Sequence, residues 1–434
     1  MAKKVLLLLA IISMVAVLVP ANILALKQVE LTITYATGDP LTKQLTHDAV
    51  VAFMKAYPNV KFIEDLSAGT TAYADTLKVK DAVGEFPDVV EMRDTPMFVR
   101  AGKLAPLPKE LYSLFESMIP VYGTVYTAPI TAQYPNGILY NKKVFKANGW
   151  SENPKTYADF LKLCDKIKLS GVAPFVAGIK DIWHLGFWFG KFWVDNIGTK
   201  NPNWMADRYA GKVHFTDPDF AGGIKQLVEL FTKGYAEAGF MSTTESQCPM
   251  ILISGKAAMY YCGTFVFTQI MTADPSFDLG WFPLPDNAGK VKLLGGATPN
   301  GWALSTDAAK DPDKMGAFVR FVRFFFAKKQ YTNFVASMNG FPTTKLRISY
   351  EVTSPAMQTI LKIFPKAPKS LNWNNGVGAN ELPPPFRNWT YKKLQEAMIG
   401  SVTADQALKD MDAEFDRLAK DFNPSQLVPV KFNP

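Results

Sequence analysis

Asp181 and Trp183 are the two residues whose types and spacing point most directly to ligand chemistry. An indole ring offers a flat apolar face on which a sugar ring can stack, and a neighbouring carboxylate accepts hydrogen bonds from hydroxyl groups. This combination suits a carbohydrate. The other aromatic residues of the same segment cover several faces of one predicted helix, so we expect them to lie mostly in the core. They are Phe187, Trp188, Phe189, Phe192 and Trp193.

Charged residues and glycines stand next to several predicted strands. In an open α/β sheet, ligands bind in the loops beyond the carboxyl ends of the strands. Each residue by itself is more typical of a solvated loop or a turn, but the shared position favours a common site. The candidates from this position are Asp39, Glu91, Arg93, Asp94, Gly295 and Gly296.

Strands and helices must alternate to bring these loops together. Residues 29–35 alternate apolar and polar side chains, as in a half-buried strand, and a helical pattern follows over residues 41–57. A strand at 60–63, a helix at 73–83 and a buried strand at 88–90 continue the series. This order predicts parallel strands joined by right-handed crossovers, and therefore an α/β lobe.

Length and composition are those of a globular protein. The 434 residues, 48% of them hydrophobic, are enough for two large lobes. Lys and Arg number 47 against 39 Asp and Glu, but no run of five or more basic residues occurs, which argues against a nucleic-acid partner. Cys164 is expected in a helical core, whereas Cys248 and Cys262 could form a disulfide or remain free buried thiols.

The sequence contains no catalytic or metal-binding constellation. His47, His184 and His214 lie far apart, and none has ligand spacing with another His or Cys, so we expect no metal and no cofactor. A glycoside hydrolase would need two carboxylates about 5 to 10 Å apart across a sugar ring. Glu91 and Asp181 could face each other in this way, but no motif marks them as acid and nucleophile. We therefore expect no catalytic residue and no enzymatic activity.

Residues 1–25 have the pattern of a secretory signal peptide. Lys3 and Lys4 precede an apolar run over residues 5–19, and we place cleavage after Ala25. An uncleaved membrane anchor is the alternative, because the apolar stretch continued to residue 26 could span a bilayer. We expect an exported protein, periplasmic or extracellular, that is either soluble or tethered by an uncleaved N-terminal helix.

Several motifs, in order, resemble the extracellular solute-binding proteins of family 1, the sugar-binding receptors of ABC importers. They include FPDVV at 86–90, LYNKKVFKANGW at 139–150, SGKAAM at 254–259 and the Gly-Gly pair at 295–296, and they span nearly the whole chain after residue 25. The resemblance implies an α/β, periplasmic-binding-protein-like II fold, in which two lobes enclose a ligand cleft and move about a hinge.

The resemblance also implies that each lobe is discontinuous in sequence. By similarity, the chain crosses between the lobes near residues 128–131, 279–282 and 324–327. The first lobe is then expected to contain residues 26–130 and 281–325. The second is expected to contain residues 131–280 and 326–434.

The ligand contacts of the family map onto the first lobe and the first crossing by position. The carboxylate after the FPDVV strand corresponds to Glu91 or Asp94, with Arg93 beside it. The residue just beyond the first crossing is Gln133 or Tyr134. The resemblance implies that these side chains contact the ligand.

The second-lobe contacts map in the same way. Asp181 and Trp183 match the polar and aromatic pair of the family, and Phe265 stands where a stacking Trp is usual after the SGKAAM strand. Trp373 could add a contact, although a rigid polar loop is an equally good interpretation of its segment.

By the resemblance, the protein is a substrate-binding protein that captures a mono- or oligosaccharide and delivers it to the permease subunits of an ABC importer. We expect a monomer and no nucleic acid. The alternatives are an exported binding protein for a non-sugar solute and an exported glycoside hydrolase. Some relatives bind ferric iron through adjacent tyrosines, but Tyr260 and Tyr261 should point to opposite faces of a strand.

Overall fold

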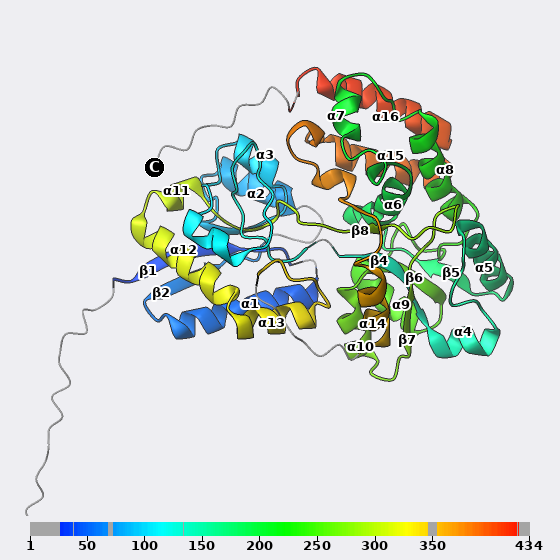
Figure 1. Cartoon of the computed structure of the whole chain (residues 1–434), viewed down its shortest axis with the longest axis horizontal. Helices are drawn as coiled ribbons and strands as arrows, with labels where there is room; N and C mark the ends of the chain where they lie inside the picture. Colours follow the sequence, from blue (N-terminus) through cyan, green and yellow to red (C-terminus); the bar gives the residue numbers. More distant parts are fainter. Residues whose placement is uncertain are drawn as a thin grey trace, which may run out of the picture.

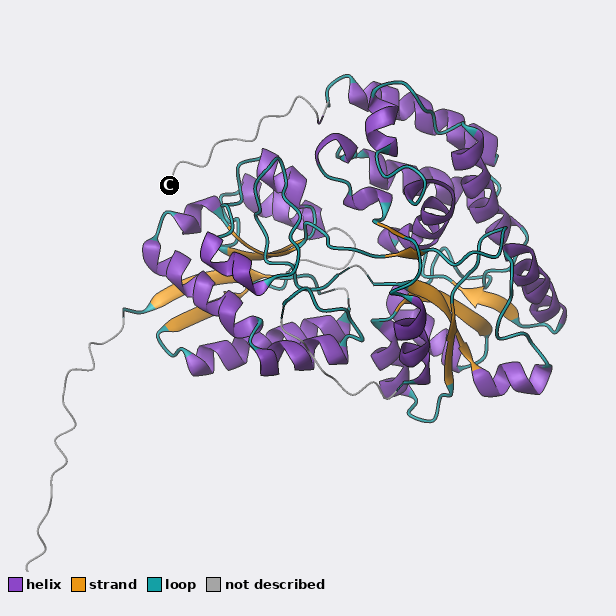
Figure 2. Cartoon of the chain, viewed as in Figure 1, coloured by secondary structure: helices purple, strands orange, loops and turns teal. Residues whose placement is uncertain are grey.

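The computed structural model describes residues 27–37, 39–67, 73–132, 134–345, 354–422 and 424. In these parts of the chain two lobes lie side by side, and each has its own sheet with helices packed around it (Figure 1 and Figure 2). The predicted α/β fold with two lobes is confirmed. The expected export segment 1–25 and the candidate Gln133 lie outside the described residues. Among the described helices, none combines the length and the apolar character needed to span a membrane.

The first lobe is built on a four-stranded sheet with the order β2-β1-β3-β9. Its strands are β1 (Val29–Thr34), β2 (Val60–Glu64), β3 (Val89–Met92) and β9 (Gly301–Leu304). The first three are parallel, and β9 runs antiparallel to β3. The helices of this lobe are α1 (Pro40–Ala56), α2 (Tyr73–Ala82), α3 (Thr95–Arg100), α11 (Thr306–Ala309), α12 (Pro312–Phe325) and α13 (Lys328–Ser337).

Asp39 determines where α1 begins. Its carboxylate accepts hydrogen bonds from the backbone N–H groups of Leu41 at 3.3 Å and Thr42 at 3.0 Å, which satisfies donors that have no partner inside the helix. Further along α1, the fully buried Phe53 packs its ring 5.4 Å from the ring of Phe321 in α12. Capping and core packing together therefore fix the end of α1 that carries Asp39.

The second lobe has a sheet with the order β5-β6-β4-β7. Its strands are β4 (Asn136–Asn141), β5 (Ala173–Val176), β6 (Ala257–Gly263) and β7 (Leu279–Phe282). Two short parallel strands, β8 (Leu293–Leu294) and β10 (Lys369–Ser370), lie beside this sheet. The helices are α4 (Lys142–Asn148), α5 (Tyr157–Leu169), α6 (Leu185–Trp193), α7 (Trp204–Tyr209), α8 (Pro218–Thr232), α9 (Cys248–Ile253), α10 (Val266–Ala273), α14 (Pro355–Ile363), α15 (Phe386–Met398) and α16 (Ala404–Ala419).

Helix α6 carries the dense aromatic segment, and most of its rings are in the core as predicted. Trp188, Phe189, Phe192 and Trp193 are each at most 6% exposed. Phe187 differs, because it is only partly buried and its ring lies near that of Phe265, just before α10. Phe187 therefore packs at the edge of the core, next to Phe265.

The chain returns to the first lobe later than the sequence predicts. Residues 279–282 form β7, which pairs with β4 inside the second sheet, so the return lies between β8 and β9. Helix α13, expected in the second lobe, lies beside α12 in the first, where Tyr331 packs against Phe325 and Phe326. This crossing was placed by similarity to the family, and the apolar pattern of a buried strand is the same whether or not it crosses between lobes.

Two backbone hydrogen bonds fix the first crossing. The N–H of Ala128 donates to the carbonyl of Trp302 at 2.8 Å, and the N–H of Trp302 donates to the carbonyl of Ala128 at 3.0 Å. Gly301, beside Trp302, has a φ of +151°, and a Cβ at this position would clash with the carbonyl oxygen of Ala128. Only glycine allows the crossing to approach β9 this closely.

The three cysteines, Cys164, Cys248 and Cys262, are all free and buried. Cys164 lies on the buried face of α5, as the helical pattern predicts. Cys248 and Cys262 could have formed a disulfide or remained free, and in the structure both are free thiols.

Gly301→Ala should lower the free energy of unfolding by about 3 kcal/mol or more, because the added Cβ forces the crossing away from β9. Gly222→Ala is the matched control, since a Cβ at this position in α8 meets open space. It should raise the free energy of unfolding by about 0.5–1 kcal/mol through helix propensity. Urea unfolding followed by circular dichroism measures both. A Gly301→Ala variant as stable as the parent would contradict the proposed constraint.

Candidate functional site in the interlobe cleft

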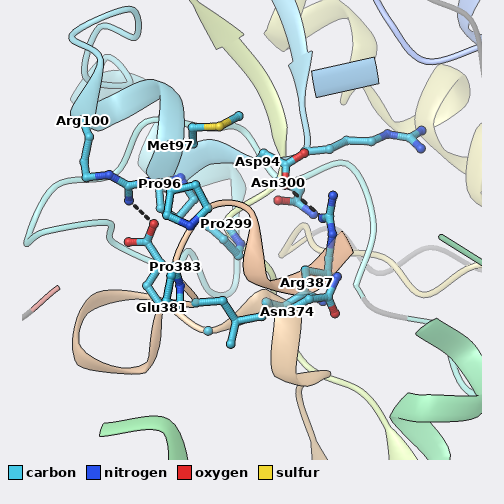
Figure 3. Close-up of a pocket in the computed structure, with 15 residues that line it drawn as sticks. Asp94, Pro96, Met97, Arg100, Pro299, Asn300, Asn374, Glu381, Pro383 and Arg387 are labelled. Carbon is cyan, nitrogen blue, oxygen red and sulfur yellow. Dashed lines mark hydrogen bonds and ion pairs between the residues drawn. The ribbon is translucent and has the colours of Figure 1, made fainter. Parts of the chain in front are cut away.

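A small cavity, open to solvent, lies where the two lobes meet (Figure 3). The first lobe lines it with α3 and with residues 93–94 and 299–300, and the second lobe with residues 374–376 and 381–387. Its charged and amide side chains include Arg93, Asp94, Arg100, Asn300, Glu381 and Arg387. Of the residues expected from the sequence, Arg93 and Asp94 are in this cavity. The lobe-two residues Glu381 and Arg387 were not among the candidates.

Two ion pairs join the lobes at this cavity (Figure 3). Asp94 in the first lobe pairs with Arg387 in the second, at 3.1 Å. Arg100 pairs with Glu381, which also accepts a hydrogen bond from the hydroxyl of Tyr122. Burial raises the pKa of the Glu381 carboxyl, while Arg100 acts in the opposite direction. The ion pairs link α3 to the loop that precedes α15, through Glu381, and to the first turn of α15, through Arg387.

Glu91 supports Arg93 and leaves it available to a ligand. One oxygen of Glu91 accepts a hydrogen bond from the N–H of Ala36 at 3.0 Å, and the other accepts two from the guanidinium of Arg93 at 2.7 and 2.9 Å. The guanidinium lies 6.0 Å from the centre of the Tyr73 ring. The side chain of Arg93 is still 46% exposed, so it can donate to a ligand from a fixed position.

Four aromatic side chains form a continuous aromatic row: Trp183, Phe187, Phe265 and Tyr134. Trp183 belongs to the short helix η2 (Ile182–His184), and its ring centre is 5.7 Å from that of Phe187. The Phe187 and Phe265 rings are 5.9 Å apart, and the Phe265 and Tyr134 rings are 5.8 Å apart. The row brings three expected residues together and adds Phe187, which the sequence pattern assigned to the core.

Asp39 brings a first-lobe carboxylate to the Tyr134 end of this row. Gln269 in α10 donates a hydrogen bond to Asp39 across the two lobes. Burial raises the pKa of the Tyr134 hydroxyl, and the charge of Asp39 raises it further, whereas Arg93 lowers it. The charges of Asp39 and Arg93 therefore both act on the Tyr134 hydroxyl.

Asp181 lies behind the aromatic row and holds Glu245, a residue that was not among the candidates from the sequence. Asp181 is buried, and it accepts a hydrogen bond from the backbone N–H of Glu245 at 2.8 Å. Glu245 is 1% exposed, and its Oε2 atom has no hydrogen-bond partner among the described residues. Burial raises the pKa of the Glu245 carboxyl to about 8, with smaller contributions from the charges of Asp39 and Asp181.

His184 is the buried neighbour of Trp183. Its Nε2 atom lies 3.1 Å from the hydroxyl of Tyr260, and its Nδ1 atom has no partner among the described residues. Burial lowers the pKa of this imidazole to about 3, so it is neutral at ordinary pH. Within the described residues, no three His, Cys, Asp or Glu side chains are arranged to hold a metal ion.

Gly295, Gly296 and Trp373, which we expected to contact a ligand, lie outside this arrangement. The glycines follow β8, where the N–H of Gly295 donates to β10 at 3.1 Å. Trp373 is 2% exposed, and its ring is stacked on that of Phe189 with 4.3 Å between centres. Its ring belongs to the core of the second lobe, and the next residue, Asn374, lines the cavity instead.

Two lobes that meet at a cavity lined by paired charges, with an aromatic row elsewhere between the same elements, are typical of a two-lobed binding protein. Comparison with known proteins gives the family. The chain belongs to the bacterial extracellular solute-binding proteins, whose family model matches residues 48–357.

Individual relatives agree with this assignment. The chain is 28% identical over 389 residues to an uncharacterised ABC transporter extracellular-binding protein of Pyrococcus horikoshii, covering 85% of this chain and 84% of that one. It is 23% identical to the multiple sugar-binding protein of Streptococcus mutans, covering 70% and 72%. The alignment with a second uncharacterised ABC transporter extracellular-binding protein of P. horikoshii covers 55% of that second protein. Among solved structures, a chitin oligosaccharide binding protein superposes with a TM-score of 0.78 at 22% identity, covering 91% and 99%.

The two buried groups Glu245 and His184 predict how stability depends on pH. The pKa of Glu245 rises from 4.5 to about 8 on folding, so the folded state keeps a proton that the unfolded state loses, and stability falls as pH rises through this window. The pKa of His184 falls from 6.5 to about 3, so its contribution is lost as pH falls below 6.5. The two effects cancel between pH 4.5 and 6.5, and only the Glu245 effect acts between 6.5 and 8.

We expect the free energy of unfolding to fall by about 2 kcal/mol between pH 6.5 and 8 because of Glu245, at about 1.4 kcal/mol per pH unit. Glu245→Gln removes the titrating group and keeps the shape of the side chain, so its stability should be level over the same range. Urea unfolding at pH 5, 6.5 and 8 measures both proteins. An equal fall in the two would assign the effect to other groups.

Proposed function

We propose that this protein is the substrate-binding component of an ABC importer, and that it captures a mono- or oligosaccharide in the interlobe cleft. The observation that carries this proposal is the aromatic row, with Asp39 and Arg93 of the opposite lobe at one end. Aromatic planes stack on the apolar faces of sugar rings, while charged side chains form hydrogen bonds with the hydroxyl groups.

Binding and closure are coupled in this proposal. Trp183 and Phe187 belong to the second lobe and Asp39 and Arg93 to the first, so a ligand between them makes contacts with both lobes only when the lobes approach. Such a ligand stabilises the closed arrangement by the free energy of these shared contacts. A permease that recognises surfaces of both lobes can then distinguish the loaded protein from the empty one.

The relatives support both the ligand class and the destination. One of them is named a multiple sugar-binding protein and another a chitin oligosaccharide binding protein, and two are named as binding proteins of ABC transporters. The family is extracellular, which agrees with residues 1–25 acting as an export signal. We propose that the protein works as a monomer outside the cytoplasmic membrane.

The geometry favours binding over hydrolysis. Both oxygens of Glu91 are engaged by Arg93 and the backbone, and Asp181 is buried and bonded to the backbone of Glu245. Neither carboxylate is placed to protonate or attack a glycosidic bond, as the hydrolase alternative requires.

Tyr260 and Tyr261 likewise do not form an iron site. Tyr260 bonds to His184, whereas Tyr261 is buried with its ring 4.5 Å from that of Trp188. The two hydroxyls therefore have different surroundings, as strand alternation predicts.

A thermal-shift screen of mono-, di- and oligosaccharides, with amino acids, polyamines and ferric iron as controls, tests this function. Ligand at a hundred times its dissociation constant adds about 2.7 kcal/mol to the native state, which raises the melting temperature visibly. We expect a shift with a carbohydrate, and no breakdown of that carbohydrate on incubation. A shift only with the control compounds would exclude the carbohydrate assignment.

Removing a ring from the aromatic row should weaken binding of the carbohydrate found in that screen. For Trp183→Ala and Phe187→Ala we expect dissociation constants about tenfold higher or more, since a lost stacking plane costs about 1–2 kcal/mol. Leu169→Ala is the control, because Leu169 is 88% exposed at the end of α5, on the far side of the second lobe (Figure 1). Titration calorimetry measures all three. Unchanged affinity in both aromatic variants would remove the row from the site.

A further inference from the structure

Three buried side chains in the second lobe form a hydrogen-bonded chain. The hydroxyl of Tyr260 lies 3.4 Å from Oε1 of Glu245 and 3.1 Å from Nε2 of His184. All three residues are at most 1% exposed. Among the described residues, the outer atoms of the chain, Oε2 of Glu245 and Nδ1 of His184, have no hydrogen-bond partner. Two buried polar atoms without hydrogen-bond partners cost free energy of folding unless they interact with a ligand or bind a proton.

This chain lies directly behind the ligand-binding face proposed above. The ring of His184 is 5.8 Å from that of Trp183 and 5.3 Å from that of Phe187, so it touches the aromatic row from the inside. At the other end, the backbone of Glu245 is bonded to Asp181. A change in the cleft would therefore act directly on these three hydrogen-bonded side chains.

The charged and titratable groups around Glu245 come from four elements. Asp39 at the start of α1 acts on it from the opposite lobe, and Asp181 from the loop before η2. Tyr260 and Cys262 in β6 and Cys248 in α9 complete these surroundings. The two carboxylates disfavour a negative charge on Glu245, and any movement that brings Asp39 nearer would strengthen its effect.

The direction of the hydrogen bonds in this chain depends on one proton. When Glu245 is protonated, its O–H donates to the oxygen of Tyr260, the Tyr260 O–H donates to Nε2 of His184, and the imidazole carries its hydrogen on Nδ1. When Glu245 is ionised, Tyr260 donates to Glu245, His184 donates from Nε2, and Nδ1 becomes an acceptor. The two states differ by one proton released to solvent, and His184 is neutral in both.

We propose that Glu245, Tyr260 and His184 act as a proton relay behind the binding face. Closure of the lobes on a ligand favours the protonated form of Glu245. The ligand group nearest to Glu245 is uncharged. This inference rests on the proposed function. A cationic group at this position would instead favour ionised Glu245. Glu245 and Tyr260 influence the cleft through His184 and Asp181. They are therefore positioning residues and not ligand contacts.

The relay is tested without any ligand by nitrogen NMR of protein labelled with ¹⁵N-histidine, between pH 6 and 9.5. The shifts of the two ring nitrogens report which one carries the hydrogen, and His184→Gln assigns the resonances. In the wild type we expect His184 to change from the Nδ1–H to the Nε2–H form with a midpoint near pH 8. In Glu245→Gln and Tyr260→Phe, both checked for folding by circular dichroism, His184 should keep one form throughout. A single form at every pH in the wild type would overturn the relay.

The coupling to binding is tested by calorimetric titration with the carbohydrate found in the screen. The dissociation constant of the wild type should rise above pH 8, by up to about tenfold per pH unit, with one proton taken up on binding. In Glu245→Gln it should not change with pH, whereas Phe187→Leu should weaken binding equally at every pH. Proton release, or affinity that is independent of pH in the wild type, would overturn the coupling. Absence of binding by every carbohydrate would contradict the proposed function, while the NMR result would still decide the relay.

Discussion

The two hydrogen bonds between Ala128 and Trp302 are the constraint on which the placement of the lobes depends. They hold the first crossing of the chain against β9, the edge strand of the first sheet, and they require a residue without a side chain at Gly301. Six residues further on, Tyr134 begins the aromatic row. The row therefore starts from a point that is rigidly attached to the first lobe, although most of its rings belong to the second.

Two kinds of interaction occur between the lobes that this constraint places. Arginine–carboxylate pairs at the cavity hold α3 against α15 and the loop before it; the Asp94–Arg387 pair is partly exposed, and the Arg100–Glu381 pair is largely buried. The groups behind the aromatic row are buried, so their interactions are stronger and more specific, whereas Trp183, Phe187 and Tyr134 of the row itself are only partly buried. The pairs at the cavity favour the approach of the lobes, and the buried groups determine what can lie between them.

Periodicity predicted the alternating strands and helices and the two lobes, because each depends on local apolar patterns. It also placed Arg93 and Asp94 directly after the third strand and Trp183 just before the aromatic helix, which agrees with the end of β3 and the start of α6. Similarity to the family, by contrast, suggested a crossing at residues 279–282, which form β7 inside the second sheet. It also offered Trp373 as a further contact, whereas the ring of Trp373 is stacked on that of Phe189 in the core. Glu245 was missed because a carboxylate in a polar segment resembles a solvated one, and only the folded chain shows that it is buried.

The three free cysteines have a consequence for how this chain reaches its native state. Burial raises the pKa of each thiol, so the folded protein offers almost no thiolate to an oxidant. The unfolded chain has no such protection. In an oxidising compartment, folding therefore competes kinetically with disulfide formation, and a mispaired bridge would trap the chain before the second lobe can close its core. Burial of Cys248 in α9 and of Cys262 in β6 removes these two thiols from that competition.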